Sequence, residues 1–167
     1  MAKTKAAIDR QVQLVMTQRG VGYLTGLAVV HTLGDVSRFT RLAKQVVSFV
    51  GFDPLERSSA GKTRFGKISK AGSPLLRFHL GMAAQMAVRS DAKLKSFYKR
   101  LARKKPKPVA KTATARKLLV KLAIMLRDNI TADEFDQRGR TVGNARLATR
   151  SEMTVRMIGP ANPLKTM

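Results

Sequence analysis

The sequence predicts an all-α fold: a compact domain of about six helices that contains a helix-hairpin-helix element and is followed by a disordered tail. Apolar residues recur mostly at helical spacing, and β-like alternation is scarce. Glycine, proline and short polar residues stand where these stretches begin and end. The hydrophobic content of 44% is enough for a core, and the absence of cysteine excludes disulfides and thiolate metal sites.

Charge divides the chain into two parts. The whole sequence has 33 Lys and Arg against 10 Asp and Glu, a net charge of +23. Residues 132–167 hold only 6 of the basic and 4 of the acidic residues, show no sustained periodicity and contain several Gly and Pro. We therefore predict a basic domain over 1–130 and a mostly disordered tail over 131–167. So large a positive charge on one small domain indicates a polyanionic partner, above all nucleic acid.

The first half of the domain contains three expected helices. The first covers 6–17, with apolar residues near one face at Ile8, Val12, Leu14 and Val15. The segment "RGVG" ends it, and the second helix, 23–33, is apolar nearly all round and should be central. Ser37 or Thr40 is expected to cap the third, 41–50, while Gly34 and Gly51 suit the ends of the second and third helices.

Residues 51–73 predict an ordered loop with a short hairpin around "TRFGKIS". Ser73 and Pro74 then form an N-cap and N1 pair, and the helix after them should bury Leu76, Leu80, Ala83 and Ala87. Ser90 and Asp91 are expected to cap a helix over 92–105. The last helix, 109–128, should bury Ala115, Leu118, Leu119, Leu122 and Leu126 and turn Lys111, Lys117, Lys121 and Arg127 largely outward.

The stretch "QRGVGYLTG" (18–26) has the form of a helix-hairpin-helix. Gly20 and Gly22 permit positive φ and close backbone approach, and the amides that open the second helix can face an anion. Gly20, Val21 and Gly22 are therefore candidate phosphate-binding positions. A plain tight turn has the same pattern, so both interpretations stay open on these residues.

The segment from Arg57 to Ser90 contains seven Lys or Arg residues and no carboxylate. Such a run can neutralise several phosphates, and the candidates are Lys62, Arg64, Lys67, Lys70 and Arg77. Few aromatic residues are interleaved, so base stacking is not the expected mode. By themselves Ser58 and Ser59 are interpreted as turn residues, and His31 and His79 as structural or surface histidines.

Several motifs, in this order, resemble the C-terminal half of the bridge-RNA-guided insertion-sequence transposases, the insertion-sequence one-hundred-ten family. They are "RGVGYLT", "LGDVSRF" (33–39), "GFDPLERSSAGKTRFGKISKAGSPLLR" (51–77), "FYKRL" (97–101) and "ATARKLLVKLAIML" (113–126). Three positions depart from the family pattern: Arg19 replaces Pro, Ala60 replaces Gly, and Ser73 replaces Asn. None of these changes removes the serine of the central motif.

The resemblance implies a two-domain transposase. A DEDD carboxylate domain binds divalent metal (Mg²⁺), and a helical domain binds DNA and a structured guide RNA and supplies a serine that attacks the scissile phosphodiester. By position that serine is Ser59, with Ser58 as the fallback. Its hydroxyl needs electrostatic support, which Lys62, Arg64, Lys67 and Lys70 could give. We expect no cofactor in this chain, because the carboxylate domain is absent from it.

From the resemblance we expect a truncated bacterial transposase that is located in the cytoplasm or nucleoid and can form homo-oligomers. We expect the chain to bind nucleic acid without catalysing transposition alone. Two alternatives stay open: a non-enzymatic helix-hairpin-helix protein that coats DNA or RNA, and a functionless remnant. A membrane-surface role is not expected, because the amphipathic helices need their apolar faces for the core.

Overall fold

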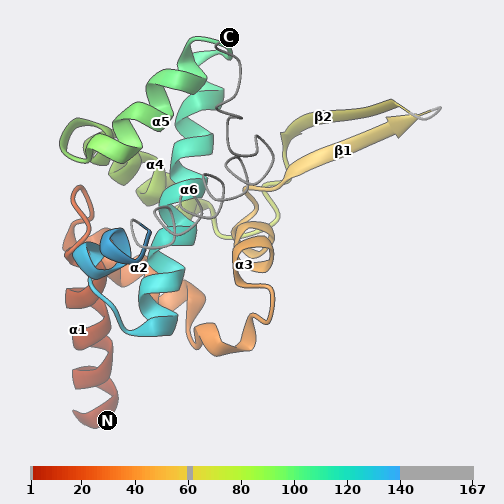
Figure 1. Ribbon diagram of the computed structural model, residues 1–167. Coiled ribbons are helices and arrows are strands. Elements are labelled where there is room, and N and C mark those ends of the chain that lie inside the picture. The colour runs from red at the N-terminus through yellow and green to blue at the C-terminus, as the bar shows by residue number, and fades with distance from the viewer. Residues whose placement is uncertain (1, 60–61, 140–167) are drawn as a thin grey trace, which may run out of the picture. The chain divides into compact units, whose positions relative to one another are not determined.

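The structure is a computed structural model that describes residues 2–59 and 62–139, with side chains over 8–55 and 66–139. The chain divides into two units, Met1–Ala132 and Asp133–Met167. In the first unit the element order is α1 (Ala2–Met16), α2 (Tyr23–Leu33), the 3₁₀ helix η1 (Val36–Arg38), α3 (Leu42–Val50), β1 (Pro54–Ser59), β2 (Lys62–Ile68), α4 (Pro74–Ser90), α5 (Ala92–Ala102) and α6 (Lys107–Asp128) (Figure 1). The predicted all-α class is confirmed, with one small hairpin added.

The second unit is described only over residues 133–139, which are helical. Residues 140–167, most of the expected disordered tail, lie outside the described residues. The first unit extends two residues past the expected boundary at 130, because Ile130 and Ala132 are buried and the Ala132 N–H donates to Thr17 Oγ1 at 3.0 Å.

Helix α6 forms the centre of the first unit, and α1, α3, α4 and α5 all pack against it (Figure 1). The five residues predicted to face inward are all buried. Each fully buried leucine among them contributes about 1.5–3 kcal/mol through burial. Lys121 contradicts the prediction, since it lies among the buried residues of α6. The cause is an acidic partner from another helix, described below.

Most helix ends follow the predicted signals. Ser73 Oγ accepts from the Leu76 N–H at 3.2 Å, and Asp91 Oδ1 accepts from the N–H groups of Lys93 and Leu94 at 2.8 and 3.1 Å. Gly51 ends α3 in the left-handed region. The predicted cap of α3 is wrong: Arg41 is its N-cap residue, and the Gln45 side chain accepts from the Arg41 N–H at 2.9 Å. Neither Ser37 nor Thr40 caps the helix: Ser37 Oγ donates to Asp35, and Thr40 Oγ1 accepts from Gln45 Nε2 at 3.4 Å.

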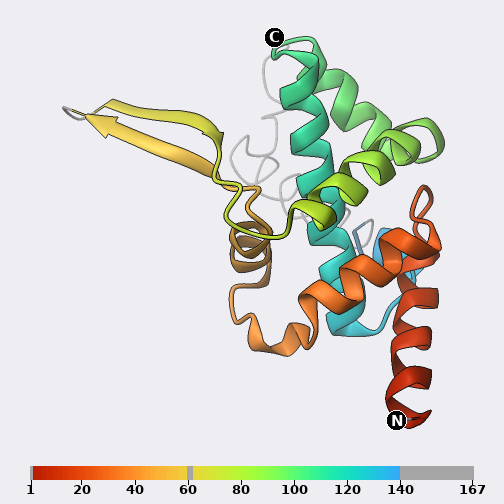
Figure 2. The same cartoon turned by 180° about the vertical axis from the view of Figure 1, so that it is seen from behind.

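The predicted short hairpin is longer than expected and forms a two-stranded arm, β1–β2. Its strands are antiparallel, with Ser59 opposite Lys62 and a register irregularity between Pro54 and Glu56. The arm runs away from the helices of the first unit in both views (Figure 1 and Figure 2). An isolated two-stranded hairpin is only marginally stable in water, so its anchoring at the base decides where its tip lies.

Candidate nucleic-acid interface

The two candidate serines lie at the far end of the arm. Ser58 pairs with Thr63 and Ser59 with Lys62, the last described pair before the tip. Residues 60–61, including the Ala60 substitution, lie outside the described residues, as do the side chains of 56–65. The backbone alone therefore places Ser58 and Ser59 at the end of the arm, away from the helical core. Lys62 lies opposite Ser59 on β2, and Arg64 lies opposite Arg57, two positions further from the tip.

Two glycines anchor the base of the arm by letting backbone approach backbone. Gly51 has φ +78°, and a Cβ there would lie 2.6 Å from Ala71 N. A Cβ on Gly72 would lie 2.8 Å from Val50 Cα. Because no side chain fits at either position, the segment after β2 packs directly on the C-terminal end of α3. The same junction holds Lys70 at a positive φ of 57°, with its N–H donating to Gly51 O at 3.1 Å.

Asp53, directly before β1, joins the two strands at the base of the arm. Its carboxylate accepts from the Ser69 hydroxyl, and its carbonyl accepts from the Ser69 N–H at 2.8 Å. Asp53 and Ser69 flank β1 and β2 directly, so this double contact sets the first step of the strand pairing. The arm therefore leaves the helices in a direction fixed by Asp53, Ser69 and the two glycines.

Arg77 serves the fold at this junction and is not simply an exposed phosphate ligand. Its Nη1 donates to Val50 O at 2.9 Å and to Gly72 O at 2.6 Å. Val50 is the last residue of α3, where an arginine satisfies an open carbonyl and complements the negative end of the helix dipole. Arg77 thus fastens α4 to the base of the arm, a use that charge counting along the sequence does not reveal.

A basic groove lies between the base of the arm and the start of α6. It has a volume of about 370 Å³, and its lining includes the cationic residues Lys67, Lys70 and Arg116 and the apolar residues Phe52, Pro54, Ile68 and Val109. No carboxylate is among the residues that line it. The groove therefore brings together two of the predicted basic candidates, Lys67 and Lys70, and adds Arg116 from a helix 46 positions further along the chain than Lys70.

The turn between α1 and α2 uses its two glycines differently. Gly20 has φ +90°, and a Cβ on it would lie 2.8 Å from Ala87 Cα and 3.0 Å from Ala83 O, both on α4. Gly22 has an ordinary φ of −91°, is the N-cap of α2, and has nothing within 4 Å of a Cβ position. Of the two glycines that permit positive φ, only Gly20 adopts it. Gly20 serves packing, whereas Gly22 faces open space at the start of α2.

The same turn is clamped to the α4–α5 junction. Val21 is buried, so it offers little surface to a ligand. Arg19 Nη1 donates to Ser90 O at 3.2 Å, and the buried Gln18 donates through Nε2 to Asp91 Oδ2 at 3.2 Å. Gln18 Oε1 has no hydrogen-bond partner among the described residues. The turn between α1 and α2 is therefore held by its own side chains, Gln18 and Arg19.

Asp91 connects three helices. It caps α5, accepts from Gln18 after α1, and lies 3.9 Å from Lys121 Nζ on α6. Burial raises the pKa of its carboxyl, but the hydrogen bonds from the Leu94 N–H and Gln18 and the charge of Lys121 together hold that pKa below its usual value. Lys121 is buried because this carboxylate faces it.

A second basic groove lies between α5 and α6. Its lining includes Lys93, Phe97, Arg100 and Lys117, and its volume is about 560 Å³. Lys117 Nζ lies 4.4 Å from the centre of the Phe97 ring. Burial, and then the positive charge of Arg100, lower the pKa of Lys117. A cluster of cations that repel one another in this way is stabilised when an anion enters.

No described group of residues fits a metal. Across 2–59 and 62–139 no three His, Cys, Asp or Glu residues gather in a group able to hold an ion. His31 is exposed on α2, and His79 packs edge-on against Phe78 on α4, with ring centres 5.6 Å apart. None of the helices in the described part of the chain is long and apolar enough to cross a bilayer.

Comparison with known proteins decides the family. Residues 12–99, just over half of the chain, match the model of the "Transposase IS116/IS110/IS902 family". The chain belongs to this family. The matched segment of this transposase-family chain runs from within α1 to within α5 and includes the turn with its two glycines, the whole arm and the α4–α5 junction.

Two curated relatives agree with this assignment. The chain is 37% identical over 87 residues to the "Transposase for insertion sequence element IS1111A" of Coxiella burnetii, covering 52% of this chain and 24% of that protein. It is 33% identical over 84 residues to the "Probable family 20 transposase" of Pseudomonas aeruginosa, covering 50% and 25%. The chain thus spans about a quarter of the length of these two transposases. Helix α6, which supplies the centre of the core, lies beyond the residues that match the family.

Proposed function

We propose that this chain is the DNA-binding part of a transposase and that the arm presents Ser59 as the nucleophile for strand exchange, with Ser58 as the fallback. The arm is the observation that carries this proposal: its anchored base and outward direction suit a serine that must meet a strand held outside the core. The family match supports action on DNA. The basic groove with Lys67, Lys70 and Arg116 at the foot of the arm supports phosphate binding beside it.

The proposed step is a transesterification. Ser59 Oγ attacks the phosphorus of the scissile phosphodiester, an Oγ–P bond forms, and the bond from phosphorus to the departing deoxyribose oxygen breaks. The hydroxyl proton passes to water, and the departing oxygen takes up a proton in turn. Because one ester replaces another, the strand stays attached to the protein and can be passed on without an external energy source. Cations around the phosphate would stabilise the charge that develops during attack.

Divalent metal enters this proposal only through another domain. The described residues do not fit a Mg²⁺ site, since no three acidic or histidine side chains among them gather in one group. Asp53 is engaged with Ser69, and Asp91 with Gln18 and Lys121. Nothing in the step above is routed through a metal held by this chain. The expectation that a DEDD carboxylate domain supplies it stays part of the proposal, as does the expectation that the chain alone does not transpose DNA.

Guide RNA and a second copy of the chain are the further proposed partners. The groove lined by Lys93, Arg100 and Lys117 offers a phosphate site apart from the arm and supports a second nucleic-acid segment such as RNA. Helix α4 bears a stripe of apolar side chains that are each more than half exposed: Leu75, Phe78, Met82 and Met86. An exposed apolar stripe of this kind supports a protein–protein contact such as a homo-oligomer.

The nucleophile is tested by trapping the covalent adduct. The chain is combined with the carboxylate domain of a full-length relative, Mg²⁺ and end-labelled DNA, and denaturation-resistant adducts are mapped by mass spectrometry. We expect an adduct on Ser59 that Ser59→Ala abolishes and Ser58→Ala retains. Loss in Ser58→Ala alone would assign the fallback, and an adduct that survives both substitutions would overturn the proposal. Cleavage or joining by the chain alone with Mg²⁺ would refute its dependence on another domain.

A non-enzymatic nucleic-acid-binding protein is the second candidate, favoured by one observation. Both basic grooves lie on the helical body or at the foot of the arm and involve neither serine. In that case Lys→Ala changes in either groove weaken binding to all sequences alike, while Ser58→Ala and Ser59→Ala change nothing in any assay.

A further inference from the structure

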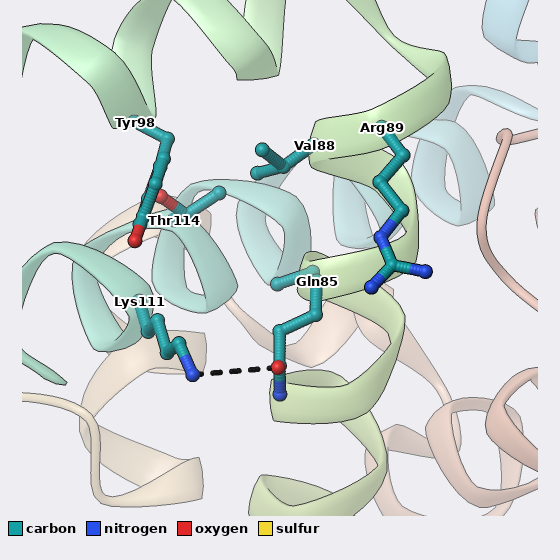
Figure 3. A pocket seen from close by; sticks show the side chains of 7 residues that line it. Gln85, Val88, Arg89, Tyr98, Lys111 and Thr114 are labelled. Atoms are coloured by element: carbon teal, nitrogen blue, oxygen red, sulfur yellow. Dashed lines mark hydrogen bonds between the residues drawn. The ribbon is translucent and has the colours of Figure 1, made fainter. Parts of the chain in front are cut away.

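A small pocket lies where α4, α5 and α6 meet, away from the arm. Its volume is about 180 Å³. The polar side chains that line it come from three helices: Gln85 and Arg89 from α4, Tyr98 from α5 and Lys111 from α6. Figure 3 shows Tyr98, Thr114 and Lys111 on one side of the pocket, Arg89 on the opposite side, and Gln85 and Val88 between them.

The polar groups around this pocket have bonding capacity left over. Among the described residues, neither the Arg89 guanidinium nor the Tyr98 hydroxyl has a hydrogen-bond partner, and Lys111 has one long contact, from Nζ to Gln85 Oε1 at 3.4 Å. The buried Thr114 hydroxyl already donates to Ala110 O at 2.8 Å, so its proton is not free to bind a ligand and Thr114 only lines the pocket. No carboxylate lines the pocket. Two cations without a counter-ion favour an anionic ligand.

The tyrosine adds a different kind of contact. Phe97 and Tyr98 are neighbours on α5, yet they face two separate pockets. Phe97 is already covered by Lys117 and Arg100, whose charged groups lie 4.4 and 5.7 Å from its ring centre. Over the Tyr98 ring, no cation or aromatic ring of the described residues is found. Tyr98 can therefore stack against a planar ligand, which Phe97 cannot do without displacing Lys117.

We propose that this pocket takes one unpaired nucleotide of a bound DNA strand. Its base stacks on Tyr98 with an edge toward the Gln85 amide, and its phosphate lies between Arg89 and Lys111. A free inorganic anion would contact Arg89 and Lys111 but not the Tyr98 ring. An apolar ligand would contact the ring but not the two cations, whereas a nucleotide contacts all three. This inference rests on the DNA binding proposed above and gives it a preference for unpaired positions, which the two open basic grooves cannot provide.

The test compares duplexes that differ at one position. A DNA duplex carrying a single bulged 2-aminopurine and its fully paired counterpart are titrated with the full chain, following fluorescence and affinity. We expect binding of the bulged duplex about tenfold tighter, from one base stacked on one aromatic ring, and a quenched 2-aminopurine signal. Tyr98→Leu and Lys111→Ala should abolish this preference. Tyr98→Phe keeps the ring, and Lys104→Ala removes one exposed charge elsewhere, so both should retain it.

A second titration separates the possible failures. Adenosine monophosphate and inorganic phosphate are added to the labelled chain, and the amide signals of α4–α6 are followed by NMR. Equal responses to both would overturn the nucleotide inference in favour of a simple anion site. A response to the monophosphate without any preference for the bulge would overturn the assignment to a DNA strand. Equal affinity for both duplexes refutes the pocket and leaves the proposed function standing, whereas no duplex binding at all refutes the proposed function itself.

Discussion

Gly20 and Gly22 stand two residues apart in one turn, and the structure predicts opposite consequences for replacing them. Gly20 has φ +90° and faces the backbone of α4, with Ala87 Cα 2.8 Å from a Cβ placed there. Gly22 has φ −91° and open space around the same position. We therefore expect Gly20→Ala to damage stability and Gly22→Ala to leave it nearly unchanged.

The size of the Gly20 effect follows from two contributions. A left-handed conformation costs a residue with a Cβ about 1–2 kcal/mol. Forcing an extra methyl into a packed contact costs about 1–3 kcal/mol, and here the neighbours are backbone atoms that cannot rotate away. The total loss in free energy of unfolding is about 2–5 kcal/mol. At about 3 °C per kcal/mol for a domain of this size, the Tm falls by about 6–15 °C.

The matched control is Gly22→Ala. Alanine is a poorer N-cap than glycine, but the loss should stay below about 1 kcal/mol. A methyl at this open position would instead obstruct a phosphate approaching the amides of α2, so affinity for duplex DNA should fall. Thermal unfolding and DNA titration of the two variants separate these roles. If Gly20→Ala has the same Tm as the unmodified chain, the contact between the turn and α4 is not as described. If Gly22→Ala binds DNA normally, the turn is not a phosphate grip.

Three further predictions concern charged residues. Arg77→Ala should lower the free energy of unfolding, measured in urea, by about 1.5–3 kcal/mol. Arg77→Lys should recover only part of this loss, since an ammonium does not reproduce the planar fork of a guanidinium. An unchanged urea midpoint in Arg77→Ala would refute the role of Arg77 at the C-terminal end of α3. Because the Asp91 pKa is lowered in the folded state, its stabilisation should be full above about pH 5 and lost as the pH falls through that lowered pKa. Asp91→Asn should therefore reduce the dependence of Tm on pH in acid, and an equally steep acid decline would contradict this. Lys67→Ala and Lys70→Ala should each reduce the slope of log affinity for DNA against log salt concentration by about one, whereas Lys104→Ala should not. Equal slopes for all three variants would rule out the groove at the base of the arm as a phosphate site.

Where local chemistry decides the structure, the sequence was sufficient. Ser73 with Pro74, Asp91 and Gly51 each act on the backbone of residues two to four positions away, and all three end or begin helices as predicted. The apolar stripe of α6 is likewise a matter of helical spacing. The prediction for the cap of α3 was wrong because the helix begins after Arg41, whose side chain does not cap it, and the Thr40 hydroxyl accepts from the Gln45 side chain instead.

Where contacts are long-range, the sequence was not sufficient. Lys121 was predicted to face outward because lysine usually does, and the partner that buries it, Asp91, is thirty positions away. The pocket lined by Arg89, Tyr98 and Lys111 joins three helices whose relative register no local pattern encodes. The residue type shows that Gly20 and Gly22 both permit positive φ, but it does not show which of them uses it. Only Gly20 adopts it, and only Gly20 lies against the backbone of α4.

Several arginines of this strongly basic chain serve the fold and are not free for phosphate binding. Arg38 donates to Leu33 O, Arg77 to Val50 O and Arg19 to Ser90 O, and each acceptor is the last residue of a helix: α2, α3 and α4. A guanidinium suits this position because its several fixed donors satisfy open carbonyls while its charge opposes the helix dipole. Arginines whose guanidinium already binds a helix-terminal carbonyl are poor candidates for phosphate contacts, wherever they stand in a basic run. The cations that face open grooves, Lys67, Lys70 and Lys117 among them, are the better candidates, so net charge overstates the number of phosphates that this domain can neutralise.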